Sequence, residues 1–174
     1  MGVPQKPQKK KDAKTTGKAK ERNAEQMVAQ NRSANYHYEL LERFEAGLVL
    51  RGTEVKALRE GKANIREAYA QVRKGELWLE NCHISEYNAG GPWNHSPLGS
   101  RKLLMHKQEI RKIFAKTQQK GLTLIATRIF FRNGIAKCDL ALARGKKDWD
   151  RRADERKKEA DREVKSAIYK SRRR

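Results

Sequence analysis

Four histidines and two cysteines have the widest chemical reach in this sequence, because imidazole and thiolate groups bind metals and act as bases or nucleophiles. These residues are His37, His83, His95, His106, Cys82 and Cys138. No two histidines have the i, i+4 spacing that would place both on one helix face, and the cysteines form no CxxC pair. A tetrahedral zinc site needs clustered ligands, so the sequence predicts no bound metal.

Motifs for catalysis are also missing from the sequence. It holds no GxxxxGK[ST] phosphate loop, no GxGxxG and no GxSxG. An enzyme would need residues that meet only in the folded chain, for example a metal-dependent nuclease built on Glu45, Glu54 and Asp139. Cys82 and Cys138 fall in predicted strands, where a free cysteine is most often a small buried residue. We therefore expect no catalytic residues and no cofactor.

Charge says more about function than any single motif does. The 174 residues include 41 Lys and Arg against 21 Asp and Glu, which gives a net charge of +20. Such an excess predicts a polyanionic partner, with nucleic acid first and an acidic membrane surface second. The chain has no apolar run of about 18 residues and no apolar signal segment, so we expect no membrane span and no secretion. Two cysteines form no disulfide framework, and a reducing, cytoplasmic location is expected.

The basic residues divide the chain into three stretches. Residues 1–30 carry a net charge of +5, residues 31–143 carry +8, and residues 144–174 carry +7. The first stretch is Lys-rich with few apolar residues, so we expect a largely disordered N-terminal arm. The middle stretch holds most of the large apolar residues and is the predicted folded domain. The last stretch is the predicted C-terminal tail.

Two patterns in the first half of the domain indicate strands and a helix. Apolar residues alternate around Tyr36, Tyr38 and Leu40, which predicts a half-buried strand. Thr53 is placed to cap a short helix that Gly61 ends. Residues 68–84 predict a hairpin that turns at Lys74-Gly75. Its alternation places Leu77, Leu79 and His83 on one face, and Trp78, Glu80 and Cys82 on the other.

The second half of the domain predicts a loop, a helix and a further hairpin. Residues 87–100 are rich in Gly, Pro, Ser and Asn and form a long loop. Ile110, Ile113, Phe114 and Thr117 follow the spacing of an amphipathic helix, which Gly121 closes. Asn133-Gly134 between two β-type runs predicts a hairpin with a type I′ turn.

Together these elements predict a mainly β domain with some α-helix. The favoured architecture is a closed antiparallel barrel of about six strands, like the oligonucleotide-binding fold, with about three helices and basic disordered tails. An open twisted sheet with helices on one face is the competing architecture. In the tail, opposite charges recur at helical spacing but the apolar set is thin. We therefore expect a tail that is disordered alone and helical on a partner.

Several segments resemble the small protein B family, the transfer-messenger RNA-binding (SsrA-binding) proteins of bacteria. They are NRSA at 31–34, FEAGL at 44–48, GTEVKALREGK at 52–62, GELWLENCHI at 75–84, NHSP at 94–97, RKLLMH at 101–106, GLTL at 121–124, ALARGKK at 141–147 and DRR at 150–152. The resemblance covers residues 31 to about 152 in order.

The resemblance implies a fold and a function. The fold is an oligonucleotide-binding-type barrel with about three flanking helices. The function is to bind the transfer-RNA-like domain of transfer-messenger RNA and deliver it to stalled ribosomes, with the C-terminal tail in the decoding centre and the vacant mRNA channel. A translation elongation factor carrying the charged RNA is a further implied partner, the free protein is expected to be a monomer, and no catalysis is implied. The alternative is a ribosomal or nucleoid-type protein that coats RNA through charge alone.

Residue by residue, the resemblance implies an RNA-binding set. It comprises Asn31, Arg32, Tyr38, Glu45, Lys56, Arg59, Lys62, Arg101, Lys102, Leu104 and His106. Lysine and arginine suit phosphate contacts, and Glu45 suits a base amino group or a 2′-hydroxyl. Three alternatives stay open: Glu45 pairs with Arg43 or Lys56, Tyr38 lies in the barrel wall, and Leu103 faces outward instead of Leu104.

The same resemblance implies a ribosome-binding start to the tail. Its residues are Gly145, Lys146, Lys147, Trp149, Asp150, Arg151 and Arg152. Trp149 stands where other members of the family often carry His or Tyr, and its flat ring keeps the ability to stack on a base.

Overall fold

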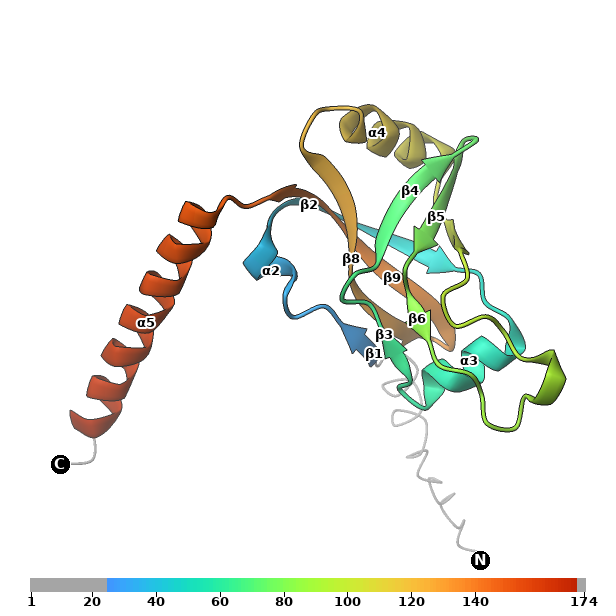
Figure 1. Cartoon of the computed structure of the whole chain (residues 1–174), viewed down its shortest axis with the longest axis horizontal. Helices are drawn as coiled ribbons and strands as arrows, with labels where there is room; N and C mark the ends of the chain where they lie inside the picture. The colour runs from blue at the N-terminus through green and yellow to red at the C-terminus, as the bar shows by residue number, and fades with distance from the viewer. Residues whose placement is uncertain (1–24, 172–174) are drawn as a thin grey trace, which may run out of the picture.

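The strongest local signal in the sequence, Asn133-Gly134, joins two of the three longest described strands. In a computed structural model, which describes residues 25–171, β8 (Leu122–Arg132) and β9 (Ile135–Gly145) pair antiparallel along their length. Asn133 and Gly134 have φ angles of 54° and 77°, the left-handed values that a type I′ turn requires. The predicted hairpin is confirmed, and it forms the long spine of the barrel (Figure 1).

The second predicted hairpin is also confirmed, with one change of face near its end. Strands β4 (Tyr69–Arg73) and β5 (Glu76–Glu80) are joined at Lys74 and Gly75, both with positive φ. Leu77 and Leu79 are buried as predicted. Beyond β5 the predicted faces are wrong, because Cys82 is buried and His83 is exposed. Asn81 has a φ of 53°, and this left-handed residue interrupts the two-residue alternation.

Six antiparallel strands form a ring within the described residues. β8 pairs with β4, then follow β5, β7 (Arg101–Leu104) and β2 (Tyr38–Leu48), and β9 completes the circuit back to β8. Every neighbouring pair in this ring is hydrogen-bonded, so the predicted six-stranded barrel is confirmed, although it is not strictly closed. The β4–β8 and β2–β7 joins are only two residue pairs long, because the strands diverge there. A separate two-stranded ladder joins β3 (Ala63–Asn64) to β6 (His83–Ile84).

The N-terminal side of the domain differs from its prediction in two places. Gln26–Gln30, expected within the disordered arm, form β1 and pair with β8. Residues 1–24 of that arm lie outside the described residues. The strand expected from Tyr36 begins only at Tyr38, because Ala34–His37 form the short helix α2. Ala34 packs with Ile125, Ala141 and Ala143 in a small cluster outside the main core, which holds α2 against the sheet.

Helices α3 (Gly52–Arg59) and α4 (Lys107–Thr117) lie at opposite ends of the barrel (Figure 1). Both are predicted helices, and Gly61 and Gly121 follow them with positive φ. The predicted Thr53 cap is wrong: Arg51 is the N-cap of α3, and its backbone N–H donates to Glu54 Oε2 at 2.7 Å. Ile110 and Ile113 of α4 are buried, whereas Phe114 is half exposed.

The barrel interior is apolar and includes both cysteines. Its fully buried side chains include Leu77, Leu79, Leu103, Ile129 and Leu140, with Cys82 and Cys138 among them. Burial raises the pKa of Cys82 to about 11 and also raises that of Cys138 well above its ordinary value, so both thiols stay protonated at neutral pH. The cysteines are packing residues, as their place in predicted strands indicated.

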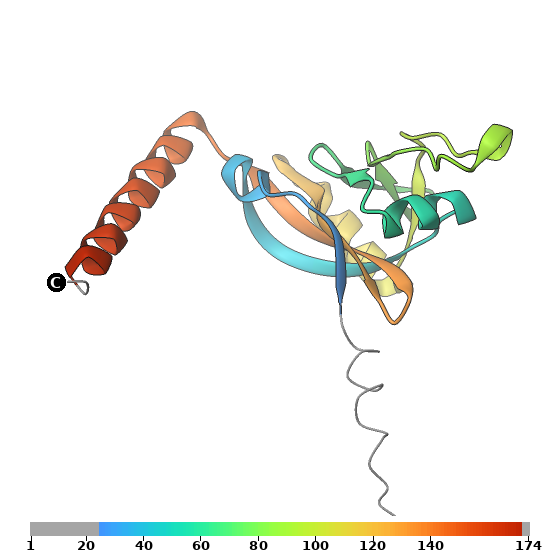
Figure 2. The same cartoon turned by 90° about the horizontal axis from the view of Figure 1, so that it is seen from below.

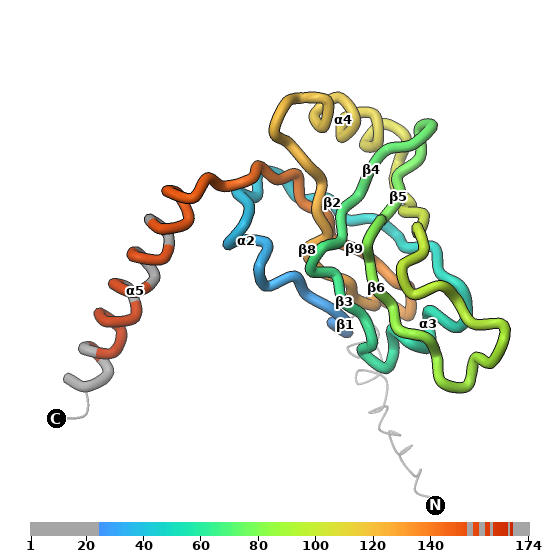
Figure 3. Tube along the Cα trace, viewed as in Figure 1, coloured from blue at the N-terminus to red at the C-terminus, as the bar shows by residue number. Residues whose placement is uncertain are grey.

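The tail leaves the barrel as one long helix. Asp148–Ser171 form α5, which projects away from the barrel beyond the end of β9 (Figures 2 and 3) and is joined to α2 by a hydrogen bond from Tyr36 to Glu155. The structure thus differs from the expectation of a tail that is disordered alone. Its sequence favours helix, since acidic residues open the first turn and opposite charges recur at i, i+4 spacing.

Candidate nucleic-acid interface

One outward face of the barrel brings together two of the side chains expected to bind RNA, Leu104 and Glu45. Gly47 of β2 pairs with Lys137 of β9 on one side and with Leu104 of β7 on the other, so the three residues form a row. Leu104 is 55% exposed and Leu103 is 1% exposed, which decides that Leu104 is the outward residue. A Cβ at Gly47 would lie 3.3 Å from Leu104 Cβ, so the glycine lets the leucine lie flat on the strand.

Glu45 lies next to this row and is held by two cations. Arg132 Nη1 and Lys137 Nζ donate to it at 2.8 and 2.5 Å, in place of the Arg43 or Lys56 considered from the sequence. Both bonds end on Oε1, and within the described residues no hydrogen bond to Oε2 is found. The hydrogen bond from Lys137 and the charge of Arg132 hold the pKa of Glu45 below its ordinary value. The group is therefore an oriented carboxylate with one oxygen available as an acceptor.

Three more charges, those of Glu25, Arg128 and Asp139, extend this cluster across β8. Arg132 also binds Glu25, and Arg128 binds both Glu25 and Asp139. The cluster of Glu25, Glu45, Arg128, Arg132, Lys137 and Asp139 holds three charges of each sign. On a protein of net charge +20, this face is locally balanced.

Beneath the charge cluster lies Phe130, a residue that sequence reasoning missed. Its side chain is 0% exposed although it belongs to neither apolar cluster of the protein. The guanidinium carbons of Arg128 and Arg132 lie 4.7 and 5.1 Å from the ring centre, and Met27 of β1 pairs opposite it. Cation–π contact and coverage by the arginine stems therefore bury a ring on the outer face. No local pattern distinguishes such a ring from a core residue.

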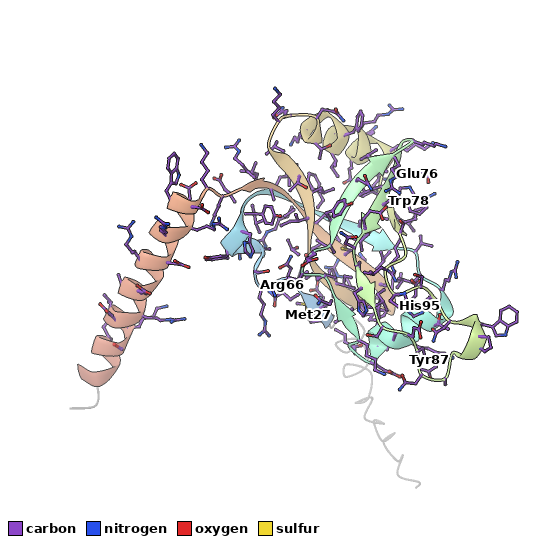
Figure 4. The ribbon with its side chains drawn as sticks, in the orientation of Figure 1. Met27, Arg66, Glu76, Trp78, Tyr87 and His95 are labelled. Carbon is purple, nitrogen blue, oxygen red and sulfur yellow. The ribbon has the colours of Figure 1, made fainter. Side chains whose placement is uncertain are left out.

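A second basic surface follows α3. Lys56 and Arg59 are exposed, and Lys62 follows the helix and pairs with Glu60 at 2.7 Å. The ammonium of Lys56 lies 5.1 Å from the centre of the Tyr87 ring, and Arg59 lies 5.9 Å from that of Phe131. Figure 4 shows Tyr87 in the loop beside α3. The predicted cations of this helix are thus grouped at the surface beside an aromatic ring.

Arg101 does not belong to the exposed interface. It is 3% exposed, and its Nε donates to Glu54 Oε1 at 2.8 Å. Its terminal nitrogens donate to the carbonyls of Cys82, Gly99, Ser96 and Pro97. The expected RNA contact is therefore replaced by an internal one, because strand alternation turns Arg101 inward.

The next residues of the RKLLMH segment do reach the surface. Lys102 is half exposed, lies opposite Trp78 in the β5–β7 register and pairs with Glu76; Figure 4 labels Trp78 and Glu76. His106 is exposed at the N-cap of α4, where its backbone N–H donates to Glu109 Oε2 at 3.2 Å. Both side chains can approach a ligand from outside the barrel.

The NRSA segment divides between structural and surface roles. Asn31 is buried, and its side-chain amide donates to the carbonyl of Arg66 at 3.0 Å while its oxygen accepts from Ser33. This side chain joins β1 to the barrel and is not presented to a ligand, contrary to the expectation. Arg32 is exposed. Tyr38 packs against the small cluster beside α2, in agreement with the barrel-wall alternative.

The start of the tail is fixed to α2 by hydrogen bonds. Lys146 donates from its backbone to His37 and from its side chain to Asn35, both at 2.9 Å. Asp150 accepts from the backbone of Lys147, which caps α5, and Tyr36 donates to Glu155 at 2.9 Å.

Other predicted tail residues surround a hollow at this junction. Trp149 is 65% exposed with the Lys147 ammonium 4.9 Å from its ring centre. A cavity of about 570 Å³ is lined by Glu39, Arg144, Gly145, Lys146, Lys147, Trp149 and Asp150. Arg151 pairs with Asp148, and Arg152 is exposed. A flat ring beside cations is suited to stacking on a nucleobase.

The carboxylates named for a nuclease do not form one centre. Glu45 and Asp139 lie opposite each other in the β2–β9 register, but each binds cations, and Glu54 is buried against Arg101. Across residues 25–171, no group of three or more His, Cys, Asp and Glu side chains is placed to hold a metal ion. None of the described helices is long and apolar enough to span a membrane.

The comparisons with known proteins agree on one family. The model of the "SmpB protein" family matches residues 28–170. The SsrA-binding protein of Desulforudis audaxviator is 54% identical over 143 residues, 82% of this chain and 94% of that protein. The one from Koribacter versatilis is 51% identical over 150 residues, 86% of each chain.

A solved structure gives the same result. A chain described as "tmRNA-SmpB: a journey to the center of the bacterial ribosome" is 49% identical, with a TM-score of 0.60 over 70% of this chain and 85% of that one. This protein therefore belongs to the SmpB family of SsrA-binding proteins.

Proposed function

We propose that this protein binds the transfer-RNA-like domain of transfer-messenger RNA and delivers it to stalled ribosomes, as a binding protein without catalysis of its own. The observation that carries the proposal is Glu45, an oriented carboxylate with Oε2 unused, beside the exposed Leu104 and Lys137. Relatives named SsrA-binding proteins and a solved chain described as tmRNA-SmpB on the bacterial ribosome support these partners.

Affinity and discrimination come from different side chains in this proposal. The exposed Lys56 and Arg59 and the half-exposed Lys102 attract phosphates, which positions any RNA without reading its sequence. Glu45 repels phosphate and accepts a hydrogen bond only from a base amino or imino group or a 2′-hydroxyl. Leu104 packs on an exposed sugar or base. Because the charge cluster around Glu45 is balanced, this face adds affinity for an RNA that presents a matching hydrogen-bond donor. It adds little affinity for polyanions in general.

The direct test is a titration of the full chain with transfer-messenger RNA and with bulk transfer RNA over a range of salt concentrations. We expect the logarithm of affinity to fall linearly with the logarithm of salt for both RNAs, because phosphate contacts release counterions. We also expect a preference for transfer-messenger RNA that persists at every salt concentration. Equal affinity throughout would favour the alternative of a protein that coats RNA by charge, which the net charge of +20 alone supports.

The variant Glu45→Gln tests the discriminating contact. We expect the Kd for transfer-messenger RNA to rise about tenfold, since a hydrogen bond to a charged group contributes roughly 1.5–3 kcal/mol. Binding of bulk transfer RNA should stay the same or tighten, because one negative charge is removed. Filter binding with both RNAs gives the ratio of the two constants.

Glu42→Gln is the matched control for this variant. Glu42 lies on the same strand, is also exposed and pairs with a cation, Lys116. The variant Glu42→Gln removes the same charge from a different place, so it should leave the ratio of the affinities for transfer-messenger RNA and bulk transfer RNA unchanged. If both variants change the ratio equally, Glu45 acts only through net charge and the assignment is wrong.

We also propose that residues 144–174 act as the ribosome-binding part of the chain. In this proposal α5 enters the decoding centre and mRNA channel, with Trp149 and the cations from Lys146 to Arg152 at its entrance. A translation elongation factor that carries the charged RNA is the further expected partner, and the free protein is a monomer in the cytoplasm. Size-exclusion chromatography with and without the RNA tests the monomer.

A further inference from the structure

A loop between β6 and β7 projects from the barrel at the end opposite α5 (Figures 1 and 2). The tip of the loop is a short 3-10 helix, η1 (Gly91–Trp93). The last residue of this helix, Trp93, is 89% exposed. A tryptophan is large and apolar and is among the residues that contribute most to binding interfaces. Single exposed apolar residues are common, so the surroundings of Trp93 decide whether it has a role.

The loop is closed directly beneath its tip by Asn94. The Asn94 side chain donates to the Tyr87 carbonyl at 2.8 Å and accepts from the backbone N–H groups of Tyr87 and His95, at 3.3 and 3.1 Å. A Cβ at Gly90 would lie 2.8 Å from that side chain, so a larger residue here would have to displace Asn94. The two ends of the tip are therefore tied together, and Trp93 is displayed by a defined turn.

The base of the loop is anchored by two buried polar side chains. His95 is 3% exposed, with Nδ1 3.0 Å from Thr53 Oγ1 of α3 and Nε2 3.2 Å from the Ile84 carbonyl. Arg101 donates to three loop carbonyls, those of Ser96, Pro97 and Gly99. An anchored loop loses little conformational entropy when it binds, which favours a contact made at its tip.

The chemistry around the loop is cationic. Lys56 lies over the Tyr87 ring at the base of the loop, and the backbone N–H of Ser85 donates to the Lys62 carbonyl at 3.1 Å. The exposed cations of α3 are thus on the element to which the loop is fixed. Residues 85–100 contain one acidic residue, Glu86. A flat ring at the tip of a loop that is fixed to a helix with exposed cations matches a nucleobase with its phosphates better than an apolar pocket of a protein.

We infer that Trp93 stacks on an exposed nucleobase of the RNA that this protein binds, while the cations of α3 hold the neighbouring phosphates. The inference rests on the proposed RNA-binding function and adds a second contact, on a different part of the surface from Glu45 and Leu104. The base belongs either to transfer-messenger RNA or to ribosomal RNA, and the same chemistry serves both.

The test compares three substitutions at Trp93 in the full chain, with isolated transfer-messenger RNA in one arm and purified small ribosomal subunits in the other. Trp93→Ala should raise the Kd about 5- to 150-fold in the arm that supplies the base. Trp93→Phe should retain most of the affinity because it keeps a flat ring, whereas Trp93→Leu should behave like alanine. Leu98→Ala, a 60% exposed residue of the same loop, is the matched control and should leave the Kd unchanged.

Two results would overturn the inference. An unchanged Kd for Trp93→Ala in both arms removes any role in RNA binding. If Trp93→Leu retains as much affinity as Trp93→Phe, the contact is an apolar one with a protein and not stacking on a base. Failure of the proposed function is read separately, from the wild-type protein alone, as equal affinity for transfer-messenger RNA and bulk transfer RNA. In that case the ratio of each variant's Kd to the wild-type Kd still reports whether Trp93 contacts RNA.

Discussion

Replacing Arg101 by methionine is expected to lower the free energy of unfolding by about 3–5 kcal/mol, because it leaves the buried Glu54 carboxylate without its cation. It also leaves four carbonyl groups without their donor, those of Cys82, Gly99, Ser96 and Pro97. For a domain of this size, the midpoint of thermal unfolding should fall on the order of 10 °C. Calorimetry or circular dichroism measures the change.

Lys102→Met is the matched control, since Lys102 is the next residue of the same strand and has a half-exposed ion pair with Glu76. Such surface pairs contribute about 0–1 kcal/mol, so this variant should unfold near the wild-type temperature. Adding Glu54→Gln to the Arg101→Met variant should recover part of the lost stability, because it removes the unpaired charge. An Arg101→Met variant with unchanged stability and reduced RNA affinity would contradict this account and return Arg101 to the RNA interface.

Deleting residues 148–174 is expected to leave RNA binding within about twofold while rescue of stalled ribosomes falls to background. The cut removes α5 and keeps the whole of β9, whose last residues Arg144 and Gly145 pair with Glu39 and Tyr38. The barrel therefore keeps its strands and its outward row at Glu45 and Leu104. The deleted part carries a net charge of +4 of the total +20, so loss of phosphate attraction is small. Peptidyl transfer to the RNA on ribosomes stalled without a stop codon is the measurement.

A scrambled tail of the same composition separates sequence from charge. We expect it to bind RNA as the wild type does and to fail in rescue, because the order of residues from Lys147 to Arg152 is lost. Rescue by the truncated or scrambled protein at the wild-type rate would remove the tail from the mechanism and favour a role through charge alone.

The two hairpins could be predicted from sequence because their signals are local. Asn133-Gly134 and Lys74-Gly75 adopt left-handed backbone angles that few other residue pairs accept, and the strands beside them follow from alternation. The strand at Gln26–Gln30 could not be predicted in this way. It is only five residues long, and it becomes a strand only because β8 offers it an edge.

The candidate site was predicted less completely, for a related reason. The family resemblance identifies Glu45 and Leu104, but their partners come from strand register: Arg132 and Lys137 lie about 90 residues away in sequence. The resemblance also carried Asn31 and Arg101 into the RNA-binding set. Both are polar residues whose side chains make hydrogen bonds inside the protein. The polarity of a residue alone does not distinguish a buried anchor from a surface contact.

The 24 residues of α5 act as a lever arm with its pivot at Lys146 and Lys147. At 1.5 Å per residue the arm is about 36 Å long, so a rotation of about 10° at the pivot moves its far end by about 6 Å. The direction of α5 relative to the barrel is thus set by three hydrogen bonds, from Lys146 to His37 and Asn35 and from Tyr36 to Glu155. A small change in the packing of α2 therefore moves the C-terminal end of α5 by several ångströms.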